Sequence, residues 1–396
     1  MVAVREIWSV ESAALRLREE IRSELDFAAA VTEQTVRSLI ERKAAEESRA
    51  RKWTSEERLW VVERVLASFR GLDILEPLLN DADVTEIMVN GHEDVFYEKH
   101  GRISRYPHRF ESRERLEDII QSIVSRVNRT VNEASPIVDA RLPDGSRVNV
   151  VLPPVSLKGP TLTIRKFPER PVTMERLLEW NAITPEAAHD LQQAVRDKTN
   201  IFISGGTGSG KTTMLNVLAQ SIPDEERVIT IEDSAELQLR TLTNVVSLET
   251  RTANTEGKGE ITIRQLLRAA LRMRPNRIIV GEVRGPEALD MLQAMNTGHE
   301  GSLSTGHANS IRDMLSRLET MAIGGADLPL EVIRKQIASA VHLVVHVSRM
   351  PDFTRKVTEI AAVEGLRGGE YVLRPAYVWK PDENGGKLCR IEQDLS

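Results

Sequence analysis

One glycine-rich octet constrains the fold of this 396-residue chain more than any other feature. Residues 205–212 read Gly-Gly-Thr-Gly-Ser-Gly-Lys-Thr and fit the pattern G-x-x-x-x-G-K-[ST]. An apolar run, Asn200–Ser204, precedes the octet, and an amphipathic helix is expected after it, over Lys211–Ser221. A strand, a glycine loop and a helix in this order predict an α/β domain that binds a nucleotide by its phosphates.

Each residue type in the octet has a physical reason in that interpretation. Glycines let consecutive backbone N–H groups turn inward around phosphates, and the helix N-terminus adds partial positive charge. Lys211 is expected to reach the β- and γ-phosphates, and Thr212 to offer its hydroxyl to Mg²⁺. The alternative, a glycine turn without a ligand, would leave Lys211 at a helix end where positive charge is disfavoured. The expected nucleotide contacts are Gly205, Gly206, Thr207, Gly208, Ser209, Gly210, Lys211, Thr212 and Thr213.

Two apolar strands downstream end in carboxylates. Residues 229–233 end in Glu232 and Asp233, where Mg²⁺-bound water or the attacking water would be held. Residues 277–282 have Gly281 where a Walker B strand usually has Asp, and Glu282 follows it. We therefore expect Glu282 to orient and polarise the water that attacks the γ-phosphate. For each strand the alternative is an acid on a solvated strand end.

Two histidines, His299 and His307, flank a further short apolar strand. A dinuclear metal site is poorly supported, because no third ligand has matching spacing. We prefer a polar strand end that senses the γ-phosphate, against the alternative of incidental polar residues.

The pattern of apolar, polar and turn-forming residues divides the chain into four parts. Residues 1–70 have apolar positions at helical spacing and predict a helical region, with a capping box at Thr54 and Glu57. Residues 71–167 predict an α+β domain with one helix, about 113–127, and short strands at 84–89, 95–98, 103–106, 148–155 and 162–167. Residues 168–174 contain prolines and predict a linker, and residues 175–396 predict the nucleotide-binding α/β domain.

The strands and helices of the α/β domain are expected to alternate. The expected strands are Asn200–Ser204, Val228–Ile231, Val245–Leu248, Arg277–Val280, Ser302–Thr305 and Val341–Val347, with a C-terminal hairpin from Val357–Val363 and Tyr371–Trp379. The helices after the first are expected at Ile263–Arg272, Pro286–Asn296 and Ser310–Met321. In the Ile263–Arg272 helix, Arg264, Arg268 and Arg272 form a stripe that we interpret as solvated; a neighbouring subunit or anionic lipid is the alternative.

Composition excludes several classes. Fifty-three Lys and Arg against 59 Asp and Glu give a net charge of −6, which lacks the basic excess of a nucleic-acid-coating protein. The apolar run Ala340–Val347 is too short to span a bilayer, and charge appears too early at the N-terminus for a secretory signal. A single cysteine, Cys389, excludes an internal disulfide. These features favour a cytoplasmic protein.

The three motif segments, with 84–91 and 138–149 upstream, resemble the type II/type IV secretion ATPase superfamily, and most closely its tight-adherence (Tad) pilus branch, the CpaF-like ATPases. The resemblance implies a RecA-like P-loop ATPase domain preceded by an α+β, PAS-like domain. It also implies that Glu232 and Asp233 form an Asp box, with Asp233 near the metal, that Glu282 lies in an atypical Walker B strand, and that His299 and His307 form a His box.

The same resemblance implies partners and further site residues. Arg141, Arg147 and Arg165 look like arginines that reach the phosphates, although each is equally compatible with a surface strand position. The family implies ATP/ADP and Mg²⁺ as ligands, a homo-hexamer, and peripheral attachment to an inner-membrane pilus platform protein. The leading interpretation is an ATPase that hydrolyses ATP with Mg²⁺ to power the assembly, or also the retraction, of a Tad-type pilus through this platform protein. The alternatives are a type IV secretion or conjugation motor, a nucleic-acid motor and a non-hydrolysing nucleotide switch.

Overall fold

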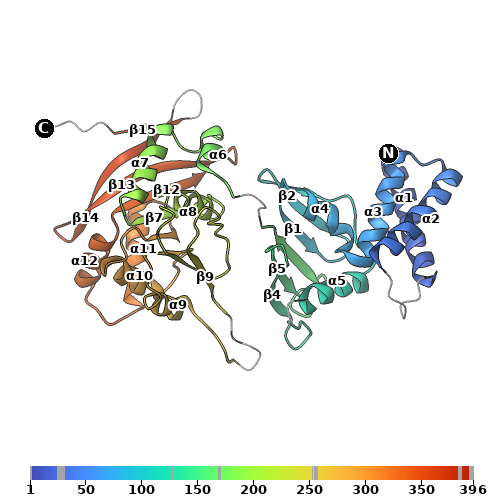
Figure 1. Cartoon of the computed structure of the whole chain (residues 1–396), viewed down its shortest axis with the longest axis horizontal. Coiled ribbons are helices and arrows are strands. Elements are labelled where there is room, and N and C mark those ends of the chain that lie inside the picture. The colour runs from blue at the N-terminus through green and yellow to red at the C-terminus, as the bar shows by residue number, and fades with distance from the viewer. Residues whose placement is uncertain are drawn as a thin grey trace. The chain divides into compact units, whose positions relative to one another are not determined.

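The computed structural model describes residues 2–24, 32–126, 129–167, 171–251, 253, 257–381 and 386–391, without the side chains of 2–9, 33 and 70. The chain forms two compact units, Met1–Glu169 and Arg170–Ser396, each described here by itself (Figure 1).

The first unit begins with three helices, α1 (Val2–Glu24), α2 (Glu33–Arg51) and α3 (Ser55–Arg70). They pack around an apolar core in which Ile21, Ile40 and Val61 are fully buried. The expected capping box at the start of α3 is confirmed. The backbone N–H of Thr54 donates to the Glu57 carboxylate at 2.6 Å, and that of Glu57 donates to the Thr54 hydroxyl at 3.1 Å. These contacts satisfy N–H groups that have no partner within the helix.

The rest of this unit is a six-stranded sheet in the order β3-β2-β1-β6-β5-β4, with all neighbours antiparallel. One face of the sheet packs on helix α5 (Arg113–Ser125) through residues such as Leu116, Ile120 and Ile164. Strand β4 is absent from the sequence expectations, because its residues alternate only weakly between buried and exposed positions. The elements are η1 (Asp73–Leu75), α4 (Glu76–Asn80), β1 (Val84–Asn90), β2 (Val95–Lys99), β3 (Arg102–Arg105), α5 (Arg113–Ser125), β4 (Ile137–Arg141), β5 (Arg147–Val151) and β6 (Thr161–Arg165).

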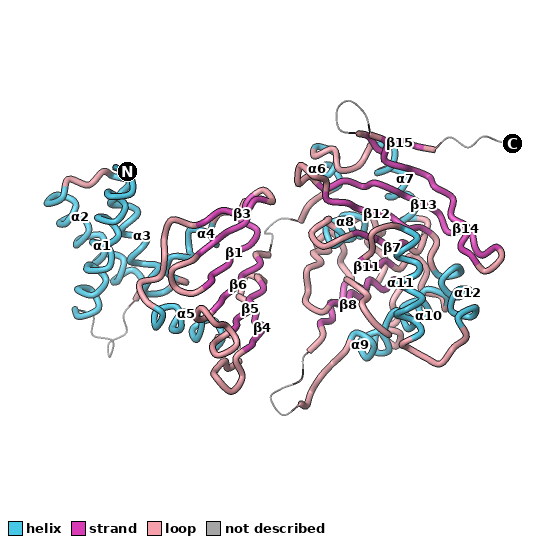
Figure 2. Tube along the Cα trace, turned by 180° about the vertical axis from the view of Figure 1, so that it is seen from behind, coloured by secondary structure: helices cyan, strands magenta, loops and turns pink. Residues whose placement is uncertain are grey.

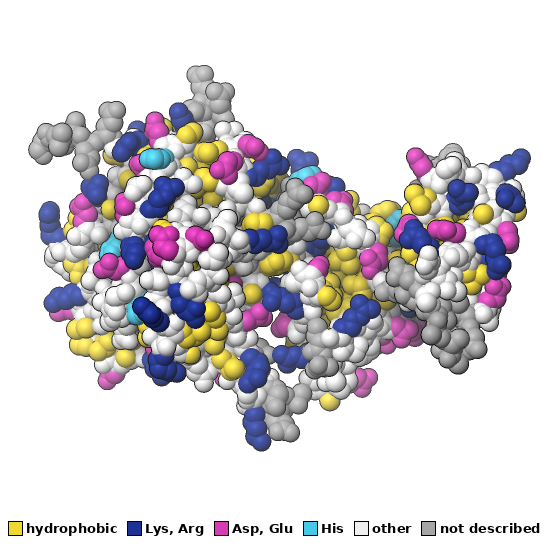
Figure 3. Space-filling model, viewed as in Figure 1, with side chains coloured by type: hydrophobic (Ala, Val, Ile, Leu, Met, Phe, Trp, Pro, Cys, Tyr) yellow, Lys and Arg dark blue, Asp and Glu magenta, His cyan; other side chains and the backbone are white. Residues whose placement is uncertain are grey.

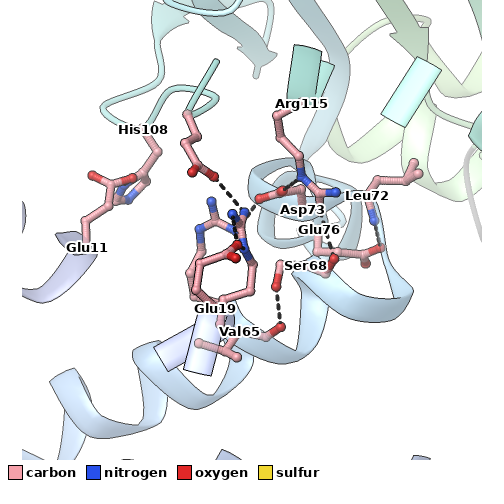
Figure 4. A network of polar contacts seen from close by, with 12 residues as sticks. Glu11, Glu19, Val65, Ser68, Leu72, Asp73, Glu76, His108 and Arg115 are labelled. Atoms are coloured by element: carbon pink, nitrogen blue, oxygen red, sulfur yellow. Dashed lines mark hydrogen bonds and ion pairs between the residues drawn. The ribbon is translucent and has the colours of Figure 1, made fainter. Parts of the chain in front are cut away.

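Ion pairs join the three-helix bundle to the sheet part of the unit (Figure 4). Asp73 is 1% exposed and pairs with Arg64 from α3 and with Arg115 from α5, the latter at 2.6 Å. Arg115 also donates to the carbonyl of Ser68 at 2.8 Å. Arg18 from α1 pairs with Glu111 at 2.7 Å. Because a buried carboxylate needs such partners, Asp73 fixes α3 against α5.

The second unit is built on a nine-stranded sheet in the order β15-β14-β13-β12-β7-β11-β10-β8-β9. The run from β12 to β9 is parallel, and β12 to β15 are antiparallel to one another. Helices cover both faces (Figures 1 and 2). The elements are α6 (Met174–Glu179), α7 (Pro185–Arg196), β7 (Ile201–Gly205), α8 (Lys211–Ala219), β8 (Val228–Glu232), β9 (Val245–Glu249), α9 (Ile263–Ala270), β10 (Arg277–Val280), α10 (Glu287–Asn296), β11 (Leu303–His307), α11 (Ile311–Ile323), α12 (Leu330–Ala340), β12 (Leu343–Arg349), β13 (Arg355–Arg367), β14 (Glu370–Lys380) and β15 (Lys387–Arg390).

The expected strand–helix alternation and the C-terminal hairpin are present, but three helices were not predicted: α6, α7 and α12. Of the expected linker, residues 168–170 lie outside the described residues, and α6 already begins at Met174. Two apolar cores lie on opposite sides of the sheet. One includes α9 to α12, and the other includes α6, α7 and α8. Strand β7 is buried at every position, so the loop that follows its C-terminal end starts from a rigid strand.

Candidate functional site

The phosphate loop leaves the sheet between two neighbouring strands. The register pairs Gly205, the last residue of β7, with His307 of β11 on one side and with Val347 of β12 on the other. A Cβ on Gly205 would clash with the Val347 carbonyl oxygen. Gly208 and Gly210 have φ values of +69° and +98°, in the left-handed region that favours glycine. The sequence therefore has glycine where the backbone requires it.

Within the loop, polar side chains turn back onto the backbone. The Ser209 hydroxyl donates to the Gly206 carbonyl at 2.9 Å. The Lys211 ammonium donates to the same carbonyl, also at 2.9 Å. Thr212 and Thr213 lie half-buried in the first turn of α8, beside the free N–H groups of that helix end. The arrangement suits a bound phosphate, because N–H groups and an ammonium face the same space.

Lys211 leads to Glu282 through His307. Lys211 Nζ lies 3.2 Å from His307 Nδ1, and His307 Nε2 lies 2.9 Å from Glu282 Oε1. Burial lowers the pKa of His307, against an opposing effect of the Glu282 charge. The neutral ring accepts at Nδ1 from the ammonium, so Nε2 carries the proton. Burial also lowers the pKa of Lys211.

Glu282 itself is held on a fixed backbone. The Thr305 hydroxyl donates to the Gly281 carbonyl at 2.8 Å, and the Val283 N–H donates to the Thr305 carbonyl at 3.0 Å. Arg284 Nη2 donates to Glu282 Oε2 at 2.7 Å. Among the described residues, Oε1 of Glu282 has no hydrogen-bond partner, since the close His307 contact is not aligned as one. One oxygen of the carboxylate is thus anchored, and the other is a buried acceptor.

Glu232, which we expected beside the reacting water, has a different position. Its side chain is 4% exposed, and its Oε1 accepts from the N–H groups of Glu236 at 2.8 Å and Leu237 at 3.2 Å. A carboxylate bound in this way shapes the loop after β8. Its catalytic role stays a prediction.

Asp233 and Thr212 were the expected metal ligands. The Asp233 side chain is exposed, and its Oδ2 lies 3.9 Å from Arg284 Nη1. The part of the chain that the structure describes contains no group of three or more His, Cys, Asp or Glu residues that would hold a metal alone. A hydroxyl and one carboxylate suit Mg²⁺ bound to phosphates, because that ion keeps most of its water and takes few protein ligands.

The two expected His-box residues lie at opposite ends of one strand. His307 ends β11 beside the phosphate loop. His299 precedes β11 and lies at the other end of the parallel strands, where β7 begins. The His299 carbonyl accepts from the Ser302 hydroxyl at 2.7 Å. Because a strand rises about 3.3 Å per residue, His299 is too distant to join the Lys211–His307–Glu282 contacts of its own unit. Within one unit His299 therefore lies outside these contacts, and its His-box role stays a prediction.

The three expected arginines of the first unit form a row. Arg141 pairs in register with Arg147 across β4 and β5, and Arg147 pairs with Arg165 across β5 and β6. Their backbones therefore lie side by side at one end of the sheet. The Arg141 side chain also donates to the Gly145 carbonyl at 3.1 Å. Their contact with phosphates stays a prediction.

Sequence reasoning missed a second contact with the phosphate loop. Arg355, at the start of β13, donates from Nε to the Gly208 carbonyl at 2.9 Å. The neighbouring Arg349 lies over the ring of Phe353, 5.1 Å from its centroid. The β12–β13 turn thus rests on the loop from the side opposite His307. No local motif signals this, because 147 positions separate Arg355 from Gly208.

A cavity of about 500 Å³ adjoins the loop on the His307 side. Its size is within the usual range for small-ligand sites. Its lining includes Gly206, Thr207, His307, Asn309, Asp313 and Arg317.

The arginine stripe of α9 is only partly solvated. Arg264 pairs with Asp290 of α10 at 2.7 Å, and Arg268 lies 3.3 Å from the other Asp290 oxygen. Arg272 donates to the Arg268 carbonyl at 2.9 Å. The first two arginines therefore fasten α9 to α10.

A parallel sheet with a phosphate loop at the end of one strand, and an acid and a histidine on neighbouring strands, defines a RecA-like P-loop nucleotide-binding domain. Comparison with known proteins names the family. Residues 69–372 match the family described as "Type II/IV secretion system protein", and the chain belongs to this family.

Curated relatives agree with that assignment, and a solved structure resembles the fold. The chain is 38% identical to the "Putative conjugal transfer protein Rv3659c" of Mycobacterium tuberculosis, over 82% of this chain and 93% of that protein. It is 35% identical to the "Conjugal transfer protein TrbB" of Rhizobium radiobacter, over 74% and 88% of the two chains. The fold resembles that of the pilus retraction motor PilT with bound ADP, with a TM-score of 0.52 at 18% identity, over 82% and 84% of the chains.

These relatives refine the sequence-based family assignment. The superfamily is confirmed, but closeness to the Tad branch is not shown by proteins named for conjugal transfer. The alternative of a conjugation or type IV secretion protein is the better supported one.

Among the described residues, no helix is long and apolar enough to cross a membrane.

Proposed function

We propose that this protein hydrolyses ATP and that hydrolysis powers a conjugation or type IV secretion machine. One observation carries the catalytic part: the contacts from Lys211 through His307 to a buried Glu282 oxygen beside the phosphate loop. A cation for the phosphates and an acceptor for a proton lie within one short chain of contacts.

In the proposed reaction, Glu282 Oε1 accepts a hydrogen bond from a water molecule and draws its proton. The water oxygen attacks the γ-phosphorus, the bond to the bridging oxygen breaks, and ADP and phosphate leave. Lys211 offsets the negative charge that spreads over the phosphate oxygens. The neutral His307 holds Lys211 at one ring nitrogen and faces Glu282 with the other.

We further propose Mg²⁺ as the metal that accompanies ATP. Thr212 and Asp233 would hold it, and when bound it would neutralise charge on the β- and γ-phosphates. Two oxygen ligands from the protein suit this ion, because Mg²⁺ prefers oxygen and keeps most of its water molecules.

The family and the arginine row support a ring of identical chains. We propose a homo-hexamer in which Arg141, Arg147 and Arg165 reach phosphates and stabilise developing charge. We also propose a cytoplasmic location, peripheral to the inner membrane through a membrane-embedded partner. A Tad pilus motor is the second candidate, supported by the resemblance in residues 84–91 and 138–149.

The test of activity is phosphate release from ATP by the purified chain, with and without Mg²⁺, beside Lys211→Ala. Removal of the ammonium is expected to weaken ATP binding about 10- to 100-fold, because a charged hydrogen bond contributes about 1.5–3 kcal/mol. Lys335→Ala, an exposed lysine on α12, is the matched control and is expected to bind ATP normally. No release by the wild-type chain, or equal binding by Lys211→Ala, would contradict the proposal.

The test of the transport class uses the native host with the Lys211→Ala allele. Loss of DNA or protein transfer with intact pili supports the conjugation or secretion assignment. Loss of pili with intact transfer supports the Tad alternative.

A further inference from the structure

Arg284 lies at the rim of the site and has no role in the activity proposed above. Its Nη2 donates to Glu282 Oε2 at 2.7 Å, and its Nη1 lies 3.9 Å from Asp233 Oδ2. The guanidinium thus spans the ends of two neighbouring strands, β10 and β8. The hydrogen bond with Glu282 raises the pKa of Arg284, so the side chain remains a cation.

The backbone of Arg284 is fixed independently of its side chain. The N–H groups of Arg284 and Gly285 both donate to Glu287 Oε1, at 2.7 and 2.8 Å. Glu287 is the first residue of α10, where a carboxylate is favoured by the helix end. The side chain therefore starts from a fixed point, and its two contacts with Glu282 and Asp233 set the position of the guanidinium.

The consequence for Glu282 follows from its two oxygens. Oε2 is bound by Arg284, and Oε1 is a buried acceptor without a hydrogen-bond partner among the described residues. A carboxylate held at one oxygen cannot rotate freely about its last bond, so the other oxygen keeps its direction. Without the guanidinium, the carboxylate would keep only the 2.9 Å contact of Oε1 with His307 Nε2, which is not aligned as a hydrogen bond, and it could turn about its last bond.

We propose that Arg284 is a positioning residue for ATP hydrolysis: its guanidinium fixes the Glu282 carboxylate so that Oε1 faces the attacking water. The proposal rests on the proposed function, because it needs Glu282 to act on that water. It assigns Arg284 to turnover and leaves nucleotide binding to the phosphate loop.

The experiment compares steady-state phosphate release and ATP affinity for the wild type, Arg284→Ala, Arg284→Lys and Glu282→Gln. Arg284→Ala is expected to lower kcat about 10- to 100-fold with little change in ATP affinity. Arg284→Lys keeps the charge with a different donor geometry, and its kcat is expected to lie between those of the wild type and Arg284→Ala. Guanidinium ion added to Arg284→Ala is expected to restore part of the lost kcat. The control is Arg367→Ala, which replaces an exposed arginine at the end of β13.

A double variant separates positioning from a general loss of structure. In the Glu282→Gln background, Arg284→Ala is expected to cost no further turnover, because both changes remove one interaction. The role of Arg284 would be overturned, with the proposed function intact, by any of three results. These are additive losses in the double variant, a loss of ATP affinity in Arg284→Ala as large as its loss of kcat, or turnover of Arg284→Ala equal to or faster than that of the wild type. A wild-type chain that binds ATP without turnover would overturn the proposed function and the role of Arg284 with it.

Discussion

Arg355 braces the phosphate loop through a hydrogen bond between its Nε atom and the Gly208 carbonyl, at 2.9 Å. Its Cδ atom would lie 3.3 Å from a Cβ placed on Gly210, so the side chain also packs over the loop. A loop of glycines has little intrinsic preference for one conformation, and such outside contacts restrict it.

Arg355→Ala is therefore expected to weaken ATP binding by about 3- to 10-fold, since one hydrogen bond typically contributes about 0.5–1.5 kcal/mol. Isothermal titration with a non-hydrolysable ATP analogue measures the effect. Arg374→Ala, whose side chain pairs with Glu364 on the neighbouring strand, is the control. An affinity of Arg355→Ala equal to that of the wild type would show that the loop holds its shape without this brace.

The residues of the site differ in how far the sequence predicts them. The octet is a local motif, so each of its residues could be assigned from the sequence. The partnership of Lys211 with His307 joins residues 96 positions apart, and only their placement after separate apolar strands hinted at it. Glu232 and Asp233 are adjacent in sequence, but the Glu232 side chain is buried and the Asp233 side chain is exposed, a difference that no local pattern predicts.

At the scale of elements, β10 is fastened to the turn before β8 by a buried ion pair. Arg277 is fully buried, and its guanidinium donates to both Glu226 oxygens, at 2.7 and 2.8 Å. The bond with Arg277 lowers the pKa of Glu226. Arg277 also donates to the Val195 carbonyl at 2.5 Å, which joins α7 to the sheet.

Arg277→Met is expected to destabilise the second unit by about 3–5 kcal/mol, because it leaves the Glu226 carboxylate buried without its partner. Arg268→Met, which removes an arginine that is 60% exposed, is expected to cost less than about 1 kcal/mol. Urea unfolding of both variants makes the comparison. Similar losses in the two would contradict the view that burial decides the value of these pairs.

The strands of the second sheet were the most predictable elements. β8, β10 and β12 consist mainly of apolar residues, most of them β-branched, and are buried over most of their length, as expected of strands covered on both faces. The helices α7 and α12 were missed although their signals are present, for example Pro185 in the first turn of α7 and the spacing of Leu191 and Val195. The ion pairs that join α1 and α3 to the sheet of the first unit depend on contacts between distant segments, which no local pattern contains.

At the scale of the whole molecule, the buried His346 and the partly buried His307 make the stability of the second unit depend on pH. His346 Nδ1 lies 2.8 Å from the Ser204 hydroxyl, between β12 and β7. Burial lowers the pKa of His346 and of His307 below the ordinary value of 6.5, with the charges of Lys211 acting in the same direction on both. Asp313 opposes the shift at His346 and Glu282 opposes it at His307.

Because the unfolded chain then binds protons at higher pH than the folded one, the histidine contribution to stability is complete above about pH 6.5 and is lost as the pH falls below it. Hydrogen exchange over β7 and β12 at pH 7.5 and 5.5, corrected for the intrinsic rates, measures this change. Protection is expected to fall on acidification and to fall less in His346→Gln. Equal protection at both pH values would contradict the prediction.

Charged side chains of both signs lie on the face drawn in Figure 3, in keeping with the net charge of −6. The excess of acidic over basic residues is the observation that disfavours a nucleic-acid motor.

The most direct test of the account is single-turnover ATP hydrolysis by Glu282→Gln beside the wild type, with ATP binding measured in both. The amide keeps the size of the side chain but is a far weaker proton acceptor than the carboxylate. We predict that the variant binds ATP as the wild type does and hydrolyses it about 100-fold or more slowly. A variant that hydrolyses ATP at the wild-type rate would contradict the assignment of Glu282 as the group that acts on the attacking water.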